Sequence, residues 1–177
     1  MYNLEAFKID LKGLKEGVTS LEYDLDDAYF EAIEATEVSG GRVHTGVSLQ
    51  SLSGYFEVVI RSEGFVRVAC DRCLDEMEQP VKTENRLVVR FGTEESEDDD
   101  VVVVDENEGM LDTAWLIYEF IALAIPVRHV HAPGKCNTAM MEALEEHSTD
   151  RSRDEESTNE IDSRWSALLK LKENNTN

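Results

Sequence analysis

Residues 55–73 read YFEVVIRSEGFVRVACDRC, and the fold prediction depends on this stretch. Aromatic and β-branched residues fill Tyr55–Arg61 and Phe65–Cys70, which predicts two strands. The segment 62–64 between them, Ser-Glu-Gly, is a hairpin signal. The stretch ends in a Cys-x-x-Cys pair, so Cys70 is expected at a strand end and Cys73 in the connection that follows.

Further strands are predicted on both sides of this stretch. Alternating apolar and polar residues indicate strands at Leu21–Leu25 and Val43–Leu49, with a turn at 40–41 before the second of them. Pro80 is expected to break the chain, and Val81–Phe91 then has its apolar residues on one face of a long strand. Val101–Val104 is a candidate edge strand. Together these predict a mainly antiparallel, curved sheet, with a partial barrel as one form of it.

The helix signals are fewer. Asp26 and Asp27 can cap a short helix that runs to Ile33. Asp112 can cap a helix over Thr113–Ala124, which has Glu119 as its only charge and is therefore expected to be buried almost all round. A third, peripheral helix is predicted over 138–147. The predicted fold class is thus α+β, with one buried helix and short peripheral helices.

The charge pattern suggests where the domain ends. We expect a single α+β domain over residues 1–147, with an acidic loop over 93–108. Residues 148–162 are highly charged, have no apolar face and are interpreted as a linker. Residues 163–177 are predicted to form a short amphipathic helix and tail, because Trp165, Leu168 and Leu169 are spaced i, i+3 and i+4.

The cysteines and histidines are concentrated in two short segments. All three cysteines lie at Cys70, Cys73 and Cys136, and the segment that ends at Cys136 also contains His129 and His131. Thiolates and imidazoles are the preferred ligands of zinc, and two residues between cysteines is a usual ligand spacing. We therefore predict a candidate structural Zn²⁺ site of three cysteines and His131, with His129 as the alternative ligand.

Other interpretations of the same residues stay open at this point. The thiols can be reduced and free of metal, or Cys70 and Cys73 can form a redox pair. Cys136 beside His131 would resemble a nucleophile and its base, but the sequence identifies no third orienting residue and no oxyanion donor. We expect no catalytic residue and no cofactor other than the metal.

The overall charge restricts the classes of partner. The chain has 38 acidic and 17 basic residues among 177, a net charge of -21, so it cannot bind nucleic acid by bulk charge. Candidate local RNA contacts are Lys82, Arg86 and Arg90, which share one face of a predicted strand, although a mixed solvent-exposed face is the alternative. The acidic segments suit basic ribosomal proteins as partners.

The sequence also bears on location. The N-terminus has no basic start followed by an apolar core, so no signal peptide is expected. The longest apolar run, Ala114–Ile125, is interrupted by Glu119 and is shorter than the about 20 residues that a membrane helix needs. We therefore predict a cytoplasmic protein without a membrane partner, whose thiols are reduced or metal-bound.

One family shows the same order of features. Cys70-Asp-Arg-Cys73, an acidic loop, an apolar helix, Leu123-Ala-Ile-Pro126, and then His131 and Cys136 resemble the YceD family, and residues 163–170 resemble its C-terminal end. The resemblance covers most of residues 55–136 and that tail. It implies that the two cysteines of the first segment, His131 and Cys136 correspond to family positions. The family often has proline in place of His129, which weakens this residue as a ligand.

The resemblance carries the functional prediction. YceD proteins of bacteria and plastids are linked to accumulation of large-subunit ribosomal RNA, and their gene often neighbours that of a large-subunit ribosomal protein. The resemblance therefore implies a non-enzymatic factor in large ribosomal subunit assembly, or in accumulation or processing of 23S rRNA. Its partners would be ribosomal proteins or the 23S rRNA precursor, with no small-molecule substrate. The alternatives are a cytoplasmic thiol redox protein that uses Cys70 and Cys73, and an acidic protein-binding adaptor.

Overall fold

The computed structural model describes residues 2–14, 17–93, 98 and 100–147. The chain divides into two compact units, Met1–Thr138 and Ala139–Asn177, and each is described by itself. The first contains all the described strands, and the second contributes helix α3, Thr138–His147. The predicted boundaries at 1–147, 148–162 and 163–177 stay predictions, because the linker and the C-terminal helix lie outside the described residues. The predicted acidic loop is described only in part.

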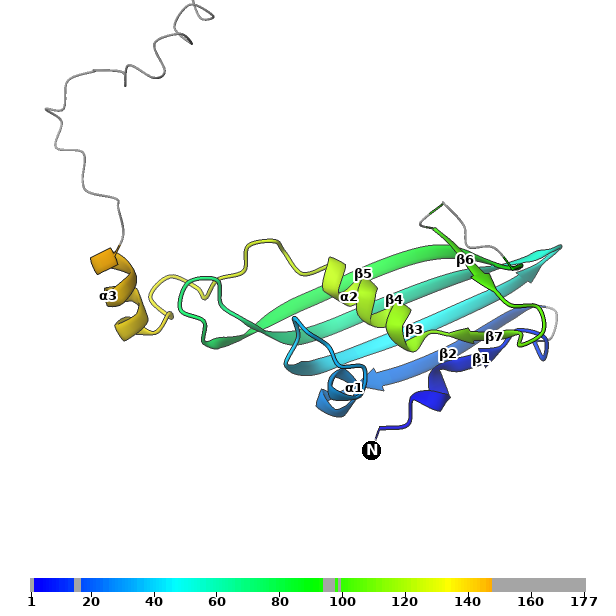
Figure 1. The fold of residues 1–177 in the computed structure, drawn as a ribbon, viewed down its shortest axis with the longest axis horizontal. Helices are drawn as coiled ribbons and strands as arrows, with labels where there is room; N and C mark the ends of the chain where they lie inside the picture. Colours follow the sequence, from blue (N-terminus) through cyan, green and yellow to red (C-terminus); the bar gives the residue numbers. More distant parts are fainter. Residues whose placement is uncertain (1, 15–16, 94–97, 99, 148–177) are drawn as a thin grey trace, which may run out of the picture. The chain divides into compact units, whose positions relative to one another are not determined.

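The main sheet has five strands in the order β2-β3-β4-β5-β6 (Figure 1). Neighbouring strands are antiparallel except β5 and β6, which are parallel. The strands are β2 Val18–Leu25, β3 Gly40–Leu52, β4 Tyr55–Ala69, β5 Glu76–Phe91 and β6 Val101–Val104. The predicted α+β class with a curved, mainly antiparallel sheet is confirmed. Among the described strands the sheet is open, and it does not close into a barrel.

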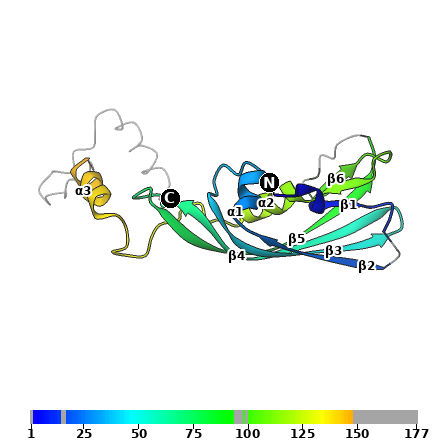
Figure 2. The ribbon, with the colours of Figure 1, turned by 90° about the horizontal axis from the view of Figure 1, so that it is seen from below.

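One face of this sheet forms the core. Alternate residues of the long strands, such as Val47, Val58 and Ile60, are buried on this face, as the two-residue period of a strand requires. Helix α1 (Asp27–Ala32), helix α2 (Ala114–Leu123) and strand β1 (Lys8–Asp10) lie over it (Figure 2). The opposite face of the sheet is rich in charged side chains.

The predicted hairpin at residues 62–64 is wrong, because β4 runs without a break through it. Gly64 pairs with Val43 of β3, and a Cβ on Gly64 would lie 2.2 Å from the carbonyl oxygen of Arg42. The turn predicted at 40–41 is wrong too, because both glycines belong to β3, and a Cβ on Gly41 would lie 2.5 Å from the carbonyl oxygen of Phe65. These glycines therefore allow two backbones to approach closely, which is a common role of glycine inside strands.

The predicted break at Pro80 is also wrong, since Pro80 lies within β5 and pairs with Phe65. Among the described residues, β6 pairs with residues 88–91 of β5 and no strand pairs with β5 on that side at Pro80, so β5 has an open edge there. The backbone N–H of Val88 donates to Asp100 on the β6 side at 2.8 Å. The backbone N–H and C=O groups of the even-numbered residues of β5 thus point to the β6 side, away from β4. Proline is tolerated there because its missing N–H would have faced the open edge.

The cap of α1 follows the prediction, the N-cap of α2 is Thr113 with Asp112 one residue before it, and burial of α2 is one-sided. The Asp26 carboxylate accepts hydrogen bonds from the N–H groups of residues 28 and 29 at the start of α1. Asp112 Oδ1 accepts from the Ala114 N–H at 2.9 Å at the start of α2. The predicted buried helix is confirmed through Ile117 and Ile121, but Trp115 is 54% and Leu123 74% exposed. No helix of the described residues has the length and apolarity to cross a membrane.

The N-terminal segment contributes elements that the sequence patterns did not predict. A 3-10 helix, η1 (Leu4–Phe7), leads into β1, which pairs antiparallel with β7 (Met110–Asp112) just before α2. The Thr113 hydroxyl donates to the Phe7 carbonyl at 2.8 Å, and the buried Tyr29 hydroxyl donates to the Ala114 carbonyl at 2.7 Å. The start of α2 is therefore held from both the N-terminal segment and α1.

Candidate metal centre

The first half of the cysteine cluster is the tight turn between β4 and β5. Cys70 follows directly after β4, its N–H donates to the Asp75 carbonyl at 2.9 Å, and the Leu74 N–H donates to the Cys70 carbonyl at 2.9 Å. The Arg72 N–H also lies 3.5 Å from Cys70 Sγ. Leu74 has a φ of 62°, a left-handed conformation that costs a residue with a side chain about 1–2 kcal/mol. The turn thus keeps a strained residue next to Cys73.

The second half is the segment that follows α2, and hydrogen bonds fasten it to the turn. The Asp71 N–H donates to the His129 carbonyl at 3.0 Å, and the His129 N–H donates to Asp71 Oδ2 at 2.7 Å. Further along, the Asn137 side-chain amide donates to Asp75 Oδ2 at 3.1 Å. These contacts bracket His131 and Cys136, so two segments that are about sixty residues apart in the sequence lie side by side.

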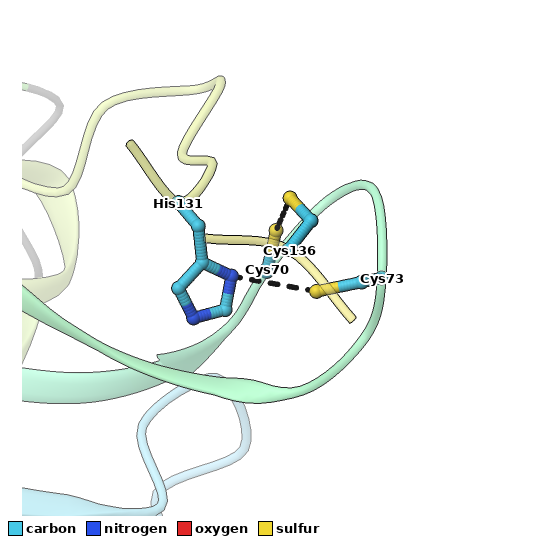
Figure 3. A group of neighbouring side chains, drawn as sticks. All are labelled: Cys70, Cys73, His131 and Cys136. Atoms are coloured by element: carbon cyan, nitrogen blue, oxygen red, sulfur yellow. Dashed lines mark hydrogen bonds between the residues drawn. The ribbon is translucent and has the colours of Figure 1, made fainter. Parts of the chain in front are cut away.

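Four side chains converge between the two segments (Figure 3). One ligand atom from each of Cys70, Cys73, His131 and Cys136 lies within 4.8 Å of all the others. Cys70 Sγ and Cys136 Sγ are 3.9 Å apart, and Cys73 Sγ is 3.4 Å from His131 Nδ1. A tetrahedral zinc ion with bonds of about 2.3 Å to sulfur separates two ligand sulfurs by about 3.8 Å. The cluster can therefore hold a metal ion, and its donor set suits zinc.

Burial and hydrogen bonding shift the pKa values of the Cys70 and Cys136 thiols in opposite directions. Burial alone would raise the pKa of the Cys70 thiol, but hydrogen bonds from the backbone of Cys73 and Arg72 and from His131 stabilise its thiolate and lower the pKa to about 5. Burial and the neighbouring Cys70 and Cys73 sulfurs raise the pKa of Cys136 to about 11. A bound divalent cation would relieve the repulsion among these sulfurs, which is how metals deprotonate clustered thiols.

All three cysteines have free thiols. The sulfurs of Cys70 and Cys136 are nearly twice as far apart as the about 2.05 Å of a disulfide bond. Cys70 and Cys73 are buried, whereas Cys136 and His131 are partly buried. The arrangement is thus that of ligands around a shared centre and differs from that of a disulfide.

His129 lies outside the cluster, although it is close in sequence. Its Nδ1 donates to the Pro126 carbonyl at 2.9 Å, and its Nε2 lies 3.7 Å from Asp71 Oδ1. The ring is therefore engaged with the backbone after α2 and with the turn. Of the two candidate histidines, His129 and His131, the structure brings only His131 to the three cysteines.

The candidate RNA-contacting residues lie on the charged outer face of the sheet. Lys82 Nζ is 2.8 Å from a carboxylate oxygen of Glu63, and Arg86 is 3.0 Å from Glu57. Lys82, Glu63 and Arg86 are exposed and Glu57 is partly buried, so solvent screens both pairs and they stabilise the fold only weakly. Arg90 is an exposed residue on the same strand. A phosphate would have to compete with carboxylates for the first two cations.

Two features of the site were not predicted from the sequence. Asp71 and Asp75 fasten the second segment to the turn, and Leu74 adopts the left-handed conformation. The sequence does place a carboxylate, Asp71, between the two cysteines, where it can accept hydrogen bonds from a segment that packs on the turn. Nothing in the sequence pattern indicated that its partner would be His129.

The fold and the cluster together define an α+β protein with a candidate metal centre of three cysteines and one histidine. A family model described as "Large ribosomal RNA subunit accumulation protein YceD" matches residues 58–172, and the chain belongs to this family. The predicted resemblance is thereby confirmed. The family's role concerns the large ribosomal subunit, and its partners are ribosome-related. The family description names no reaction. No curated protein and no solved structure gives a significant match.

Proposed function

We propose that this protein is a non-enzymatic factor in assembly of the large ribosomal subunit, acting in the cytoplasm on the accumulation or processing of 23S rRNA. The observation that supports this most directly is membership of the YceD family over residues 58–172. The proposed partners are large-subunit ribosomal proteins or the 23S rRNA precursor. The four converging donors also favour a structural site, because a catalytic zinc keeps one position open.

The metal is proposed to be a structural Zn²⁺ held by Cys70, Cys73, His131 and Cys136. When bound, it would supply a cross-link between the turn after β4 and the segment after α2. Binding energy at such a site adds to folding stability, because the unfolded chain does not hold the ligands together. The chain's own residues already orient the ligands through the Asp71–His129 hydrogen bonds.

Direct contact with rRNA is proposed for Lys82, Arg86 and Arg90. The three cations lie on the outer face of β5, opposite the buried face. Glu63 already pairs with Lys82, and Glu57 with Arg86. Lys82 and Arg86 are therefore expected to add less to the binding of RNA than isolated cations would. The triple alanine variant is expected to weaken binding to a 23S rRNA precursor modestly and to reduce its salt dependence.

The proposal is tested by purifying the tagged, full-length protein from its own cells at low salt. We expect enrichment of 23S rRNA precursor and large-subunit proteins over an untagged strain. In cells that lack the protein, mature 23S rRNA is expected to fall relative to 16S rRNA. Wild type and His129→Ala should restore it, whereas Cys73→Ser and His131→Ala should restore it poorly because they remove proposed ligands.

Two results would contradict the proposal and select an alternative. Recovery of unrelated proteins without rRNA would favour an acidic adaptor. A reversible, oxidant-dependent change in the number of free thiols at Cys70 and Cys73, together with unchanged 23S rRNA levels in the deletion strain, would favour a thiol redox protein.

A further inference from the structure

A surface groove of about 610 Å³ lies beside the candidate metal centre. One wall is formed by the end of β4 and the turn after it, including Val68, Cys70 and Leu74. The other wall is formed by the end of α2 and the segment after it, including Leu123 and Val127. The same two segments supply the four donors of the metal centre, so the groove and the centre share their framework.

The rim of this groove carries large apolar side chains in contact with solvent. Leu74 is 68%, Leu123 74% and Val127 fully exposed. Single exposed apolar residues are ordinary, but several around one concave site are typical of an interaction surface. Leu74 is also held in the left-handed conformation, which glycine or asparagine would adopt at a lower cost. Leu74 thus presents a large apolar side chain to solvent at a backbone position that does not favour leucine.

The charge of the groove indicates which class of partner fits. The described residues that line the groove include two carboxylates, Glu37 and Asp71, and they include no lysine or arginine. The chain as a whole has a net charge of -21. Carboxylates around an apolar groove attract a cationic peptide and repel the phosphates of RNA.

The walls are held in place before any partner binds. Asp71 in one wall and His129 in the other are joined by two hydrogen bonds of 3.0 and 2.7 Å. The Asn137–Asp75 hydrogen bond fastens the same two segments a second time. A groove that does not have to reorganise loses less free energy on binding, which favours recognition of a short segment.

From these observations we infer that the groove binds a basic segment of a large-subunit ribosomal protein. An apolar side chain of the segment occupies the groove between the two walls, and its lysine or arginine residues lie near Glu37 and Asp71. The inference rests on the proposed function, which it deepens by naming a protein segment, and a particular surface, as the point of contact.

The test uses the full-length chain and short overlapping peptides that cover the large-subunit ribosomal proteins of the same organism. Peptides that bind wild type are measured by fluorescence anisotropy with Val127→Glu and Glu37→Lys, both changes at exposed positions. The controls are Val18→Glu and Glu22→Lys, which make the same changes at exposed positions of β2. We expect a basic peptide whose affinity falls about tenfold or more with each groove variant and stays within about twofold with each control.

Several outcomes would overturn the inference. These are the absence of any binding peptide, equal losses with groove and control variants, or a dimer in solution that Val127→Glu dissociates. Binding of a 23S rRNA fragment that Val127→Glu weakens would also overturn it, because the groove would then hold RNA. If peptide binding fails while the purified protein still enriches large-subunit components, the proposed function stands and only the groove assignment falls.

Discussion

Asp71 and His129 bind each other in both directions, the N–H of each donating to an oxygen of the other at 3.0 and 2.7 Å. The two residues join the turn after β4 to the segment after α2, and the Asn137–Asp75 hydrogen bond joins the same segments again. The backbone of His129 therefore helps to hold the second segment of the candidate metal centre against the turn, whereas the side chain of His131 supplies the nitrogen that faces the cysteines. This division of roles can be measured.

We expect the purified protein to bind one zinc ion per chain. His131→Ala should lose the metal to a competing chelator, because only three donors would remain at the site. His129→Ala keeps all four donors and both backbone hydrogen bonds to Asp71, and should retain the metal with an affinity lowered by less than the about 10–100-fold found when a residue that orients a ligand is removed. Metal content by mass spectrometry and chelator competition measure both. Equal retention by the two variants would refute the ligand assignment.

Removing the metal should lower the stability of the fold. Since the ligands come from segments that folding brings together, metal binding contributes to the free energy of unfolding. We expect addition of a strong chelator to lower the melting temperature of wild type by several degrees and that of Cys73→Ser little or not at all. A melting temperature of wild type that does not respond to chelator or to added zinc would contradict a structural metal.

Tyr29→Phe tests how α2 is held on the core. The Tyr29 hydroxyl is buried and donates to the Ala114 carbonyl at 2.7 Å, and the substitution leaves that carbonyl without this donor. The free energy of unfolding is expected to fall by about 1–3 kcal/mol. Urea denaturation measures it, with Tyr55→Phe as the control because Tyr55 is 41% exposed. Equal midpoints for the two variants would show that this hydrogen bond contributes little.

Gly64→Ala tests whether glycine is needed inside β4. The added Cβ would lie 2.2 Å from the carbonyl oxygen of Arg42, so the strands β3 and β4 would have to separate locally. We expect a destabilisation of about 1–3 kcal/mol or more, the size found when extra atoms are forced into packed sites. Gly46→Ala in β3 is the matched control, since a Cβ there has no neighbour within 4 Å. A tolerated Gly64→Ala would contradict the close approach of the two strands.

The ion pair of His44 and Asp24 predicts a pH dependence on the outer face of the sheet. The hydrogen bond from the imidazole to the Asp24 carboxylate raises the pKa of His44 above its ordinary value of about 6.5. Because the folded-state pKa is raised, the stabilisation is fully present below the unfolded pKa and is lost as the pH rises through the folded one.

The measurement is an NMR titration of the His44 ring together with denaturation at two pH values. Asp24→Asn should move the His44 titration to lower pH, and it should reduce stability more at about pH 6 than at about pH 9. Glu31→Gln on α1 is the control. A His44 titration that Asp24→Asn leaves unchanged would show that the pair does not form in solution.

Local patterns predicted much of the sheet, and the errors have a common cause. The alternation at Leu21–Leu25 and Val43–Leu49, and the cap at Asp26, depend on residues that are neighbours in the chain, and all three were found. The hairpin at 62–64 and the break at Pro80 were wrong. Gly64 is required by the approach of another strand, and Pro80 is tolerated because β6 stops short of it.

The sequence by itself determined the chemistry available to this protein. It places three cysteines and two histidines in two short segments, gives the chain its large negative charge, and carries the features of the YceD family. These properties depend on residue type and order alone.

Only the tertiary structure decided which of these residues meet. The choice of His131 over His129, the Asp71–His129 link and the groove beside Leu74 all depend on packing between segments about sixty residues apart. Such contacts form when folding brings together surfaces whose complementarity is not encoded in local periodicity. Their physical basis is the shape of the curved sheet and the helix packed on it, which sets where the end of α2 reaches the turn after β4.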